Sequence, residues 1–254
     1  MTDSTSRSYP DFLDVALGLG NWAWGDRRFW GNRERYSDAD SRAAFDVSVA
    51  AGITLVDTAE MYGFGRAERL LGRFIHESGH RVAIATKFMP LPWRWRKGSL
   101  LRALRGSLRR LGVGQVDLYQ IHWPTPPVPV ETWAEALADA VEAGLARAVG
   151  VSNYNVEQMS RAHQVLARRG LRLASNQVAY SLLHREPERN GLLAACQEMG
   201  IRLIAYSPLG QGLLTGRYTP DNPPAGLRRF SFGGKLAAVQ PLIGLMRDIG
   251  EAHG

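Results

Sequence analysis

The stretch Gly18-Leu-Gly-Asn-Trp-Ala-Trp-Gly25 follows the first short apolar run of the chain and decides between two α/β folds. A dinucleotide-binding Rossmann unit would place a glycine-rich phosphate fingerprint here, followed directly by a helix. Gly18, Gly20 and Gly25 lack that spacing, and no helical pattern begins at once. This stretch therefore favours a β/α barrel over an open doubly wound sheet.

Apolar runs rich in Val, Ile and Leu recur along the chain at intervals of roughly 26 to 38 residues, close to the length of one strand-and-helix unit. They mostly do not alternate with polar residues, which is typical of parallel strands buried on both faces. The predicted strands are Val15–Gly20, Ile53–Asp57, Val82–Thr86, Val116–Ile121, Arg147–Val151, Leu173–Val178 and Arg202–Tyr206. We therefore expect an α/β fold of the TIM (β/α)8-barrel type with seven of its eight units present.

Helix signals stand between these runs. Ser37 is a predicted N-cap, and Ser99 precedes an apolar leucine stripe that ends at Gly112. The helix capped by Ser37 is predicted to end at Gly52. Further helices are predicted to run from Thr132 to Gly144 and from Asn155 to near Gly170, and a fifth is predicted to end at Gly200. Because strands alternate with helices and no polar linker intervenes, residues 1–254 are predicted to form a single domain.

Composition excludes several classes of protein. Hydrophobic residues make up 45% and charged residues 22% of the 254, as in ordinary soluble globular proteins. The formal net charge is +7, and Arg102, Arg105, Arg109 and Arg110 recur at helical spacing. This pattern favours a solvated helix face over a nucleic-acid footprint, although the charge would attract a small anionic ligand.

The single cysteine and the absence of long apolar segments restrict the chain further. Cys196 excludes an internal disulfide or a cysteine-based zinc site, and its apolar surroundings predict a buried thiol. No segment reaches the roughly 18 to 20 consecutive apolar residues of a membrane helix. We expect a cytoplasmic protein, or a plastid one if a transit peptide has been removed, with no membrane or nucleic-acid partner.

Ionisable side chains stand at the ends of three consecutive predicted strands. Asp57 ends the second, Lys87 follows the third and His122 follows the fourth, with Tyr62 on the loop beyond Asp57. A lone histidine after a strand is commonly a core or capped side chain, and a lone aspartate is commonly a helix N-cap. In a barrel, however, the carboxyl ends of the strands meet at one rim, where active sites lie.

These four side chains form a chemically coherent set. The Lys87 ammonium would favour the Tyr62 phenolate and so lower the pKa of Tyr62. Asp57 would hold that ammonium charged, and His122 could orient a carbonyl oxygen. The set suits protonation of a carbonyl while hydride arrives from elsewhere, and it lacks a nucleophile for hydrolysis.

Six ordered motifs carry a resemblance to the aldo-keto reductase superfamily over nearly the whole chain. They are Asp57-Thr-Ala-Glu-Met-Tyr-Gly-Phe-Gly-Arg-Ala-Glu68, Ile84-Ala-Thr-Lys-Phe88, Asp117-Leu-Tyr-Gln-Ile-His-Trp-Pro124, Gly150-Val-Ser-Asn-Tyr154, Asn176-Gln-Val-Ala-Tyr180 and Ala205-Tyr-Ser-Pro-Leu-Gly210. The stretch from Gly212 to Pro224 most resembles the plant and cyanobacterial branch of uncharacterised or pyridoxal-reducing members.

The resemblance implies reduction of an aldehyde or ketone by NADPH. It implies a catalytic tetrad of Asp57, Tyr62, Lys87 and His122, with Tyr62 as general acid. The residues that would hold NADPH are, by the same resemblance, Ser152, Asn153 and Gln177 at the nicotinamide carboxamide, Tyr206 against the nicotinamide ring, and Ser207, Leu209 and Gln211 around the pyrophosphate. No metal is implied.

The small-molecule carbonyl substrate would be walled by tryptophans on the loops after the first, third and fourth strands. Apolar aromatic side chains are typical of such pockets. We predict that Trp24 and Trp123 contact the substrate and that at least two of the five loop tryptophans, which also include Trp22, Trp93 and Trp95, pack against neighbouring loops instead.

The chain departs from the family pattern after His253, where an eighth strand would be expected. We therefore expect a truncated barrel that lacks the segment holding the adenosine 2′-phosphate, so the choice between NADPH and NADH stays open. Two alternatives to a reductase also stay open: a cofactor-sensing regulatory subunit and an inactive truncated reductase. The oligomeric state and the identity of the carbonyl are not predicted.

Overall fold

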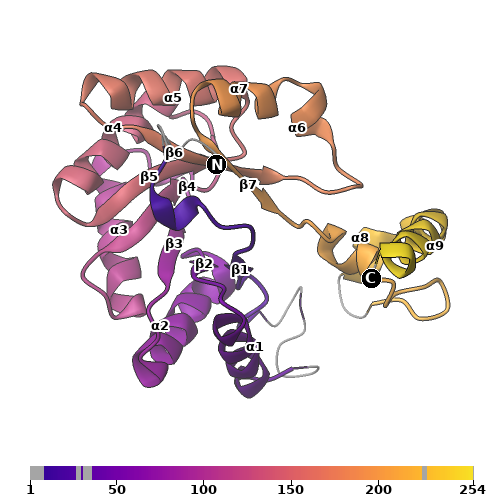
Figure 1. The fold of residues 1–254 in the computed structure, drawn as a ribbon. Coiled ribbons are helices and arrows are strands. Elements are labelled where there is room, and N and C mark those ends of the chain that lie inside the picture. The colour runs from indigo at the N-terminus through magenta and orange to yellow at the C-terminus, as the bar shows by residue number, and fades with distance from the viewer. Residues whose placement is uncertain (1–8, 27–29, 31–35, 225–227, 254) are drawn as a thin grey trace, which may run out of the picture.

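The strands form one parallel sheet whose spatial order follows the chain from β1 to β7. The computed structural model describes residues 9–26, 30, 36–224 and 228–253. Over these residues the strands are β1 (Leu19–Gly20), β2 (Leu55–Asp57), β3 (Ala83–Phe88), β4 (Val116–Ile121), β5 (Ala146–Ser152), β6 (Leu173–Ala179) and β7 (Arg202–Tyr206). Within this described part, β1 and β7 do not pair with each other. The fold is a nearly closed (β/α)8-type barrel with seven of the eight strand-and-helix units, as predicted (Figure 1).

Helices cover the outer face of the sheet (Figure 1). They are α1 (Asp38–Ala50), α2 (Arg66–Ser78), α3 (Lys97–Leu111), α4 (Val130–Glu142), α5 (Val156–Arg168), α6 (Glu186–Arg189) and α7 (Leu192–Glu198). The 3-10 turns are η1 (Asp11–Leu13), η2 (Tyr62–Gly65) and η3 (Gly210–Thr215). Two more helices, α8 (Arg228–Phe232) and α9 (Lys235–His253), lie apart from the sheet beyond β7. None of the described helices is long and apolar enough to cross a membrane.

The predicted N-caps Ser37 and Asn155 are confirmed, and each closes a capping box. Ser37 and Asn155 each accept from the N3 backbone amide while the N3 side chain accepts from the cap. The other two predicted starts are late, because α3 begins at Lys97 and α4 at Val130, ahead of Ser99 and Thr132. The bounds of helix α2 were not predicted, since its N-cap is Gly65, a left-handed glycine with no capping side chain.

Two apolar cores hold the barrel. The larger lies between the sheet and the helices and contains Trp133 and Tyr119, both completely buried. The smaller fills the barrel interior with Leu13, Leu55, Ala85, Leu118, Ala148 and Ala174. Leu13 comes from η1, and Arg202 at the start of β7 bonds Tyr9 and Val15 on either side of it, so η1 lies at the end of the interior opposite the strand carboxyl ends. Cys196 is a free, buried thiol, as predicted.

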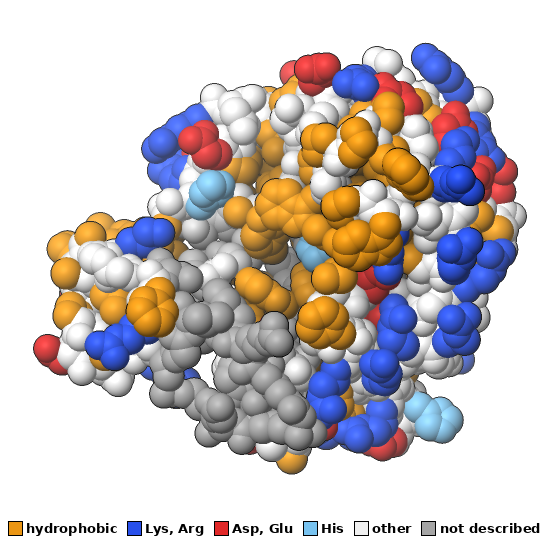
Figure 2. All heavy atoms as spheres, turned by 180° about the vertical axis from the view of Figure 1, so that it is seen from behind, with side chains coloured by type: hydrophobic (Ala, Val, Ile, Leu, Met, Phe, Trp, Pro, Cys, Tyr) orange, Lys and Arg blue, Asp and Glu red, His pale blue; other side chains and the backbone are white. Residues whose placement is uncertain are grey.

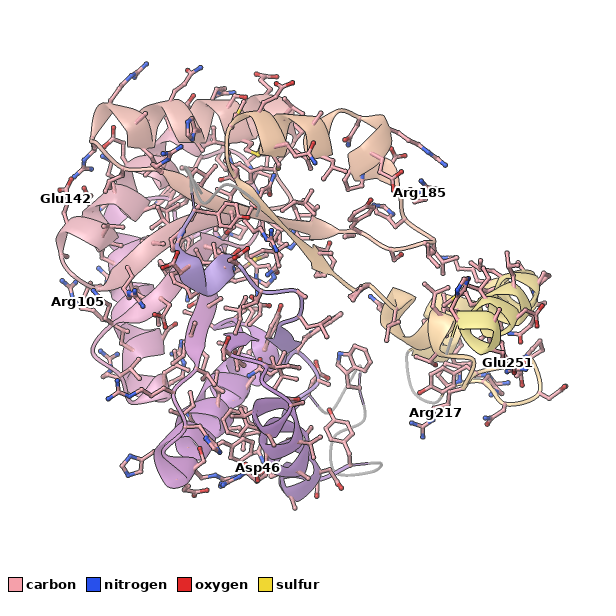
Figure 3. The ribbon with its side chains drawn as sticks, in the orientation of Figure 1. Asp46, Arg105, Glu142, Arg185, Arg217 and Glu251 are labelled. Atoms are coloured by element: carbon pink, nitrogen blue, oxygen red, sulfur yellow. The ribbon has the colours of Figure 1, made fainter. Side chains whose placement is uncertain are left out.

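A third apolar cluster lies outside the barrel, among η3, α8 and α9. Its buried residues are Leu213, Leu214, Phe232, Leu236, Val239 and Ile243. Figure 3 shows this part of the chain, with Arg217 and Glu251, set off from the helices that cover the sheet. Seen from behind, hydrophobic side chains gather around a hollow in the middle of the molecule (Figure 2).

Strand register brings the polar side chains to one rim. Lys87 of β3 lies opposite Gln120 of β4, and Ser152 of β5 lies opposite Gln177 of β6. His122 follows β4 directly, and its backbone amide donates to the Phe88 carbonyl at 2.8 Å. The carboxyl ends of neighbouring parallel strands therefore converge, as in other TIM barrels.

Candidate active site

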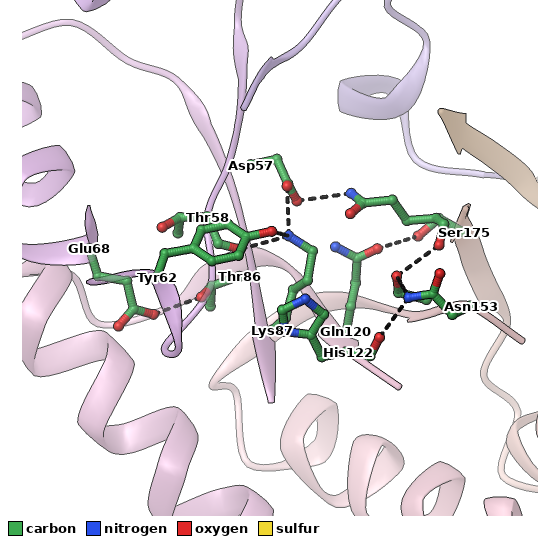
Figure 4. A network of polar contacts seen from close by, with 12 residues as sticks. Asp57, Thr58, Tyr62, Glu68, Thr86, Lys87, Gln120, His122, Asn153 and Ser175 are labelled. Atoms are coloured by element: carbon green, nitrogen blue, oxygen red, sulfur yellow. Dashed lines mark hydrogen bonds and ion pairs between the residues drawn. The ribbon is translucent and has the colours of Figure 1, made fainter. Parts of the chain in front are cut away.

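The ammonium of Lys87 is the centre of a polar network at this rim. Lys87 is completely buried, and its Nζ donates to Asp57 Oδ2 at 2.6 Å, to the Thr58 carbonyl at 2.9 Å and to the Tyr62 hydroxyl at 3.3 Å (Figure 4). An ammonium carries three N–H donors, so all three have partners. A buried charge is tolerated only when it is paired and hydrogen-bonded in this way.

The charge of Lys87 is held by its neighbours. Burial by itself would lower the pKa of Lys87, but the Asp57 carboxylate and the Tyr62 oxygen outweigh it. The resulting pKa of Lys87 lies above its usual value. Lys87 therefore stays protonated at neutral pH and presents a fixed positive charge to Tyr62.

Tyr62 stands on the sharp turn η2, where Gly63 and Phe64 both have left-handed backbone angles. Burial raises the pKa of Tyr62, and the opposing effect of Lys87 does not cancel it. The predicted effect of Lys87 has the right sign, but the expectation of a net lowering is wrong because removal of the phenol from water dominates. Tyr62 therefore carries its proton at neutral pH.

His122 faces the Tyr62 ring. The two ring centroids lie 5.8 Å apart with an edge-on geometry. Burial, and secondarily the Lys87 charge, lower the pKa of His122 to about 3. Its buried Nδ1 has no hydrogen-bond partner among the described residues. His122 is therefore a neutral imidazole with one unused polar atom, suited to contact with an uncharged carbonyl.

The network continues from the four tetrad positions to β5, β6 and β7. Gln177 Nε2 donates to Asp57 Oδ1 at 3.0 Å, and Ser152 Oγ donates to the backbone carbonyl of Gln177 at 2.7 Å. Asn153 Nδ2 donates to Ser152 Oγ at 3.0 Å, while Asn153 Oδ1 accepts from the Tyr206 hydroxyl at 2.9 Å. The structure thus brings these predicted cofactor residues together with the tetrad.

Ser207, Leu209 and Gln211 lie on the loop after β7. Ser207 has φ +53° and Gln211 has φ +57°, left-handed angles uncommon for these residue types. Leu209 is 53% exposed. In the part of the chain that the structure describes, no hydrogen bond joins these three side chains to the tetrad network, so their predicted contact with a pyrophosphate remains a prediction.

Trp22 and Trp24 lie in different surroundings: Trp24 is in the outer core and Trp22 is beside Tyr62. Trp24 is 5% exposed and packs against Phe45 of α1 and Phe74 of α2, with ring centroids 6.5 and 5.5 Å away. The prediction that Trp24 contacts substrate is therefore wrong, because its ring is enclosed in the outer core. Trp22 instead lies 6.2 Å from the Tyr62 ring.

The other three loop tryptophans are exposed to solvent. Trp123 is 45% exposed, and Trp93 and Trp95 are 72% and 63% exposed. Trp123 follows His122 in the chain, so its backbone lies beside the tetrad. Its predicted contact with substrate remains a prediction.

Two buried carboxylates beside Tyr62 were not singled out by sequence. Glu60 Oε1 accepts from the Met89 amide at 2.9 Å and pairs with Arg94. Glu68, completely buried, accepts from Thr86 Oγ1 at 2.7 Å and from Arg110 Nε at 2.5 Å.

Both carboxylates lie inside the Asp57–Glu68 motif. Their place in a motif beside buried strands was the sequence signal that could have predicted two buried, paired carboxylates. Glu60 ties the segment before η2 to the loop after β3, and Glu68 ties α2, directly after η2, to β3 and α3. Among the described residues, no group of three His, Cys, Asp or Glu side chains could hold a metal ion.

Comparison with known proteins identifies the family of the chain. The model of the aldo/keto reductase family matches residues 16–254. The chain belongs to the aldo/keto reductase family. Among curated family members, a chloroplastic pyridoxal reductase of Arabidopsis thaliana is 41% identical over 252 residues, covering 94% of this chain and 68% of that protein. An aldo-keto reductase of Bacillus subtilis is 38% identical over 214 residues, covering 81% of this chain and 61% of the relative.

Solved aldo-keto reductase structures share the fold. One from Klebsiella pneumoniae, in complex with NADP and acetate, is 36% identical with a TM-score of 0.66, covering 78% of this chain and 65% of that one. A glycerol dehydrogenase from Gluconobacter oxydans is 31% identical with a TM-score of 0.71, covering 84% and 66%. This aldo-keto reductase chain thus spans about two thirds of the length of these relatives.

Proposed function

We propose that this chain is an NADPH-dependent oxidoreductase that reduces an aldehyde or ketone to an alcohol. The observation that carries the proposal is the buried Lys87 ammonium, held by Asp57 and hydrogen-bonded to a protonated Tyr62. Family membership supports it, as do the NADP and NADPH complexes of the related Klebsiella pneumoniae enzyme.

The residues present suit a nicotinamide cofactor. A planar carboxamide needs hydrogen-bond donors for its oxygen and an acceptor for its amide, and Ser152, Asn153 and Gln177 supply hydroxyl and amide groups of both kinds. They already form one cluster joined to Asp57 and Tyr206. We propose that Ser152, Asn153 and Gln177 hold the carboxamide, that Tyr206 lies against the nicotinamide ring, and that Ser207, Leu209 and Gln211 contact the pyrophosphate.

When bound, NADPH supplies the hydride for carbonyl reduction. The Tyr62 hydroxyl gives its proton to the carbonyl oxygen as negative charge develops there. The Lys87 ammonium, 3.3 Å from that hydroxyl, stabilises the phenolate left behind, and Asp57 keeps the ammonium charged. His122, as a neutral imidazole, donates its one N–H to the substrate carbonyl oxygen without placing a second positive charge beside Lys87.

The substrate class is a small carbonyl compound with an apolar or aromatic body. The Trp22 ring lies beside Tyr62, the exposed Trp123 follows His122 in the chain, and aromatic side chains favour planar apolar partners. The name of the Arabidopsis relative makes pyridoxal a first substrate to try.

A cytoplasmic or plastid location is also part of the proposal, as is a single domain over residues 1–254. A complete tetrad favours turnover over a purely cofactor-sensing role.

The substitution Tyr62→Phe tests the proposal. Loss of the proton donor should lower kcat by about 10² to 10⁴, while NADPH affinity stays within about twofold of wild type. The measurements are NADPH oxidation with an aldehyde panel and quenching of tryptophan fluorescence by NADPH. Tyr180→Phe, which removes an exposed hydroxyl bonded to Glu188, is the matched control and should keep full activity. Undiminished turnover in Tyr62→Phe would refute the assigned role.

A further inference from the structure

A basic groove lies along α3, separate from the tetrad. Its volume is about 380 Å³, within the range of small-ligand pockets. Its lining includes Arg94, Arg102, Arg109 and Arg110, together with Glu60 and Trp93. Seen from behind, Lys and Arg side chains gather along the side of the molecule where α2 and α3 lie (Figure 2).

Gly106, a buried glycine of α3, is part of the groove lining. A Cβ atom at Gly106 would lie 3.2 Å from Arg110 Nη1 and 3.9 Å from Arg109 Nη2. The guanidinium groups of Arg109 and Arg110 therefore both lie close over Gly106, where the missing Cβ leaves room for them. Arg102 joins them because residues i, i+4, i+7 and i+8 share one face of a helix.

The charges in the groove are only partly neutralised. Arg94 pairs with Glu60, while Arg110 donates through Nε to Glu68 and through Nη2 to Ser107 Oγ at 3.1 Å. Arg110 Nη1 lies close to Gly106, which also lines the groove. In the described part of the chain, no ion pair engages Arg102 or Arg109, both of which are exposed. Since Arg94 already neutralises Glu60, the groove retains a net positive charge.

We propose that this groove is a binding site for the phosphate group of a small phosphate ester. A guanidinium presents paired N–H donors that match phosphate oxygens, and the exposed Arg102 and Arg109 supply two such groups on one face of α3. The Trp93 ring, 72% exposed in the same groove, offers a surface for the ester's apolar or planar part. The site contains no tetrad residue, so the inference stands apart from the proposed reductase activity.

Calorimetric titration of the 254-residue chain with phenyl phosphate and with inorganic phosphate tests this inference. Both titrations are run with saturating NADPH, so that cofactor sites are occupied. We expect saturable binding of one phenyl phosphate per chain. Arg102→Ala and Arg109→Ala should each weaken it about tenfold, the loss expected for one charge-assisted hydrogen bond. Trp93→Ala should weaken phenyl phosphate but not inorganic phosphate, which separates ester recognition from free-ion binding.

Arg105→Ala is the matched control. Arg105 is an exposed arginine of the same helix that does not line this groove (Figure 3), so its removal changes net charge equally. Affinity in that variant should stay within about twofold of wild type. Three results would overturn the inference. The first is no saturable binding of phenyl phosphate, and the second is that Arg105→Ala weakens binding as much as Arg102→Ala and Arg109→Ala do. The third is that inorganic phosphate binds more tightly than phenyl phosphate and that Trp93→Ala does not weaken phenyl phosphate binding.

Discussion

The carboxylate of Asp57 accepts a hydrogen bond at 3.0 Å from the side-chain amide of Gln177, 120 residues later in the chain. Its other oxygen accepts from Lys87 at 2.6 Å. One aspartate therefore links the residues proposed for proton transfer to those proposed for the nicotinamide. A disturbance on either side should reach the other through Asp57.

Replacing Gln177 tests this link. Gln177→Ala removes a proposed carboxamide contact and leaves Asp57 Oδ1 without a partner, so NADPH affinity should fall about tenfold and kcat should fall with it. NADPH titration and steady-state kinetics measure the two effects. Gln197→Ala, at an exposed glutamine of α7, is the control. An unchanged kcat with weakened NADPH binding would show that Asp57 does not transmit the change.

Replacing Asp57 tests the buried ion pair. Asp57→Asn leaves the completely buried Lys87 ammonium without its counter-charge, which should destabilise the fold by about 3 to 5 kcal/mol. Denaturant unfolding followed by fluorescence measures this. Asp117→Asn, at a pair whose Arg147 side chain is 58% exposed, should cost less than about 1 kcal/mol beyond the loss of its hydrogen bond to the Ile84 amide. Equal costs for the two variants would contradict the assigned role of Lys87.

The two neighbouring tryptophans should behave differently. Trp24→Ala empties part of the core beside Phe45 and Phe74 and should destabilise the protein by about 3 to 5 kcal/mol. Trp22→Ala should mainly raise KM for aromatic aldehydes, because the Trp22 ring lies beside Tyr62. Unfolding curves and steady-state kinetics for both variants provide the comparison. The opposite assignment of effects would place Trp24, not Trp22, at the substrate.

His122 makes a specific contribution to pH dependence. Its pKa is about 3 in the folded protein against 6.5 unperturbed, so below pH 6.5 the unfolded chain binds a proton that the folded chain does not. Stability from this residue is therefore complete above pH 6.5 and is lost as pH falls, by about 2 kcal/mol between pH 6.5 and pH 5.

His122→Gln should remove this part of the slope, as measured by urea unfolding at pH 7 and pH 5. His80→Gln, at an exposed histidine, controls for loss of a histidine as such. A wild-type slope in His122→Gln would mean that other groups account for the loss of stability. The rate profile of the wild type should also show no titration of His122 between pH 5 and pH 8.

The local patterns of the sequence predicted much of the architecture. Val116–Ile121 and Arg202–Tyr206 are strands with the predicted bounds, and Ser37 and Asn155 cap helices as expected. These features depend on neighbours within a few residues of chain. The start of helix α2 escaped prediction because left-handed Gly65 carries no side-chain signal.

The sequence by itself determined the family, the barrel and the order of strand ends that brings Asp57, Lys87 and His122 to one rim. Each follows from apolar periodicity and motif spacing, which are properties of the chain alone. Only the tertiary structure decided which tryptophan reaches Tyr62, whether burial or Lys87 controls the pKa of Tyr62, and where the α3 arginines converge. Those outcomes depend on distances and water exclusion between segments far apart in the chain, and no local pattern encodes them.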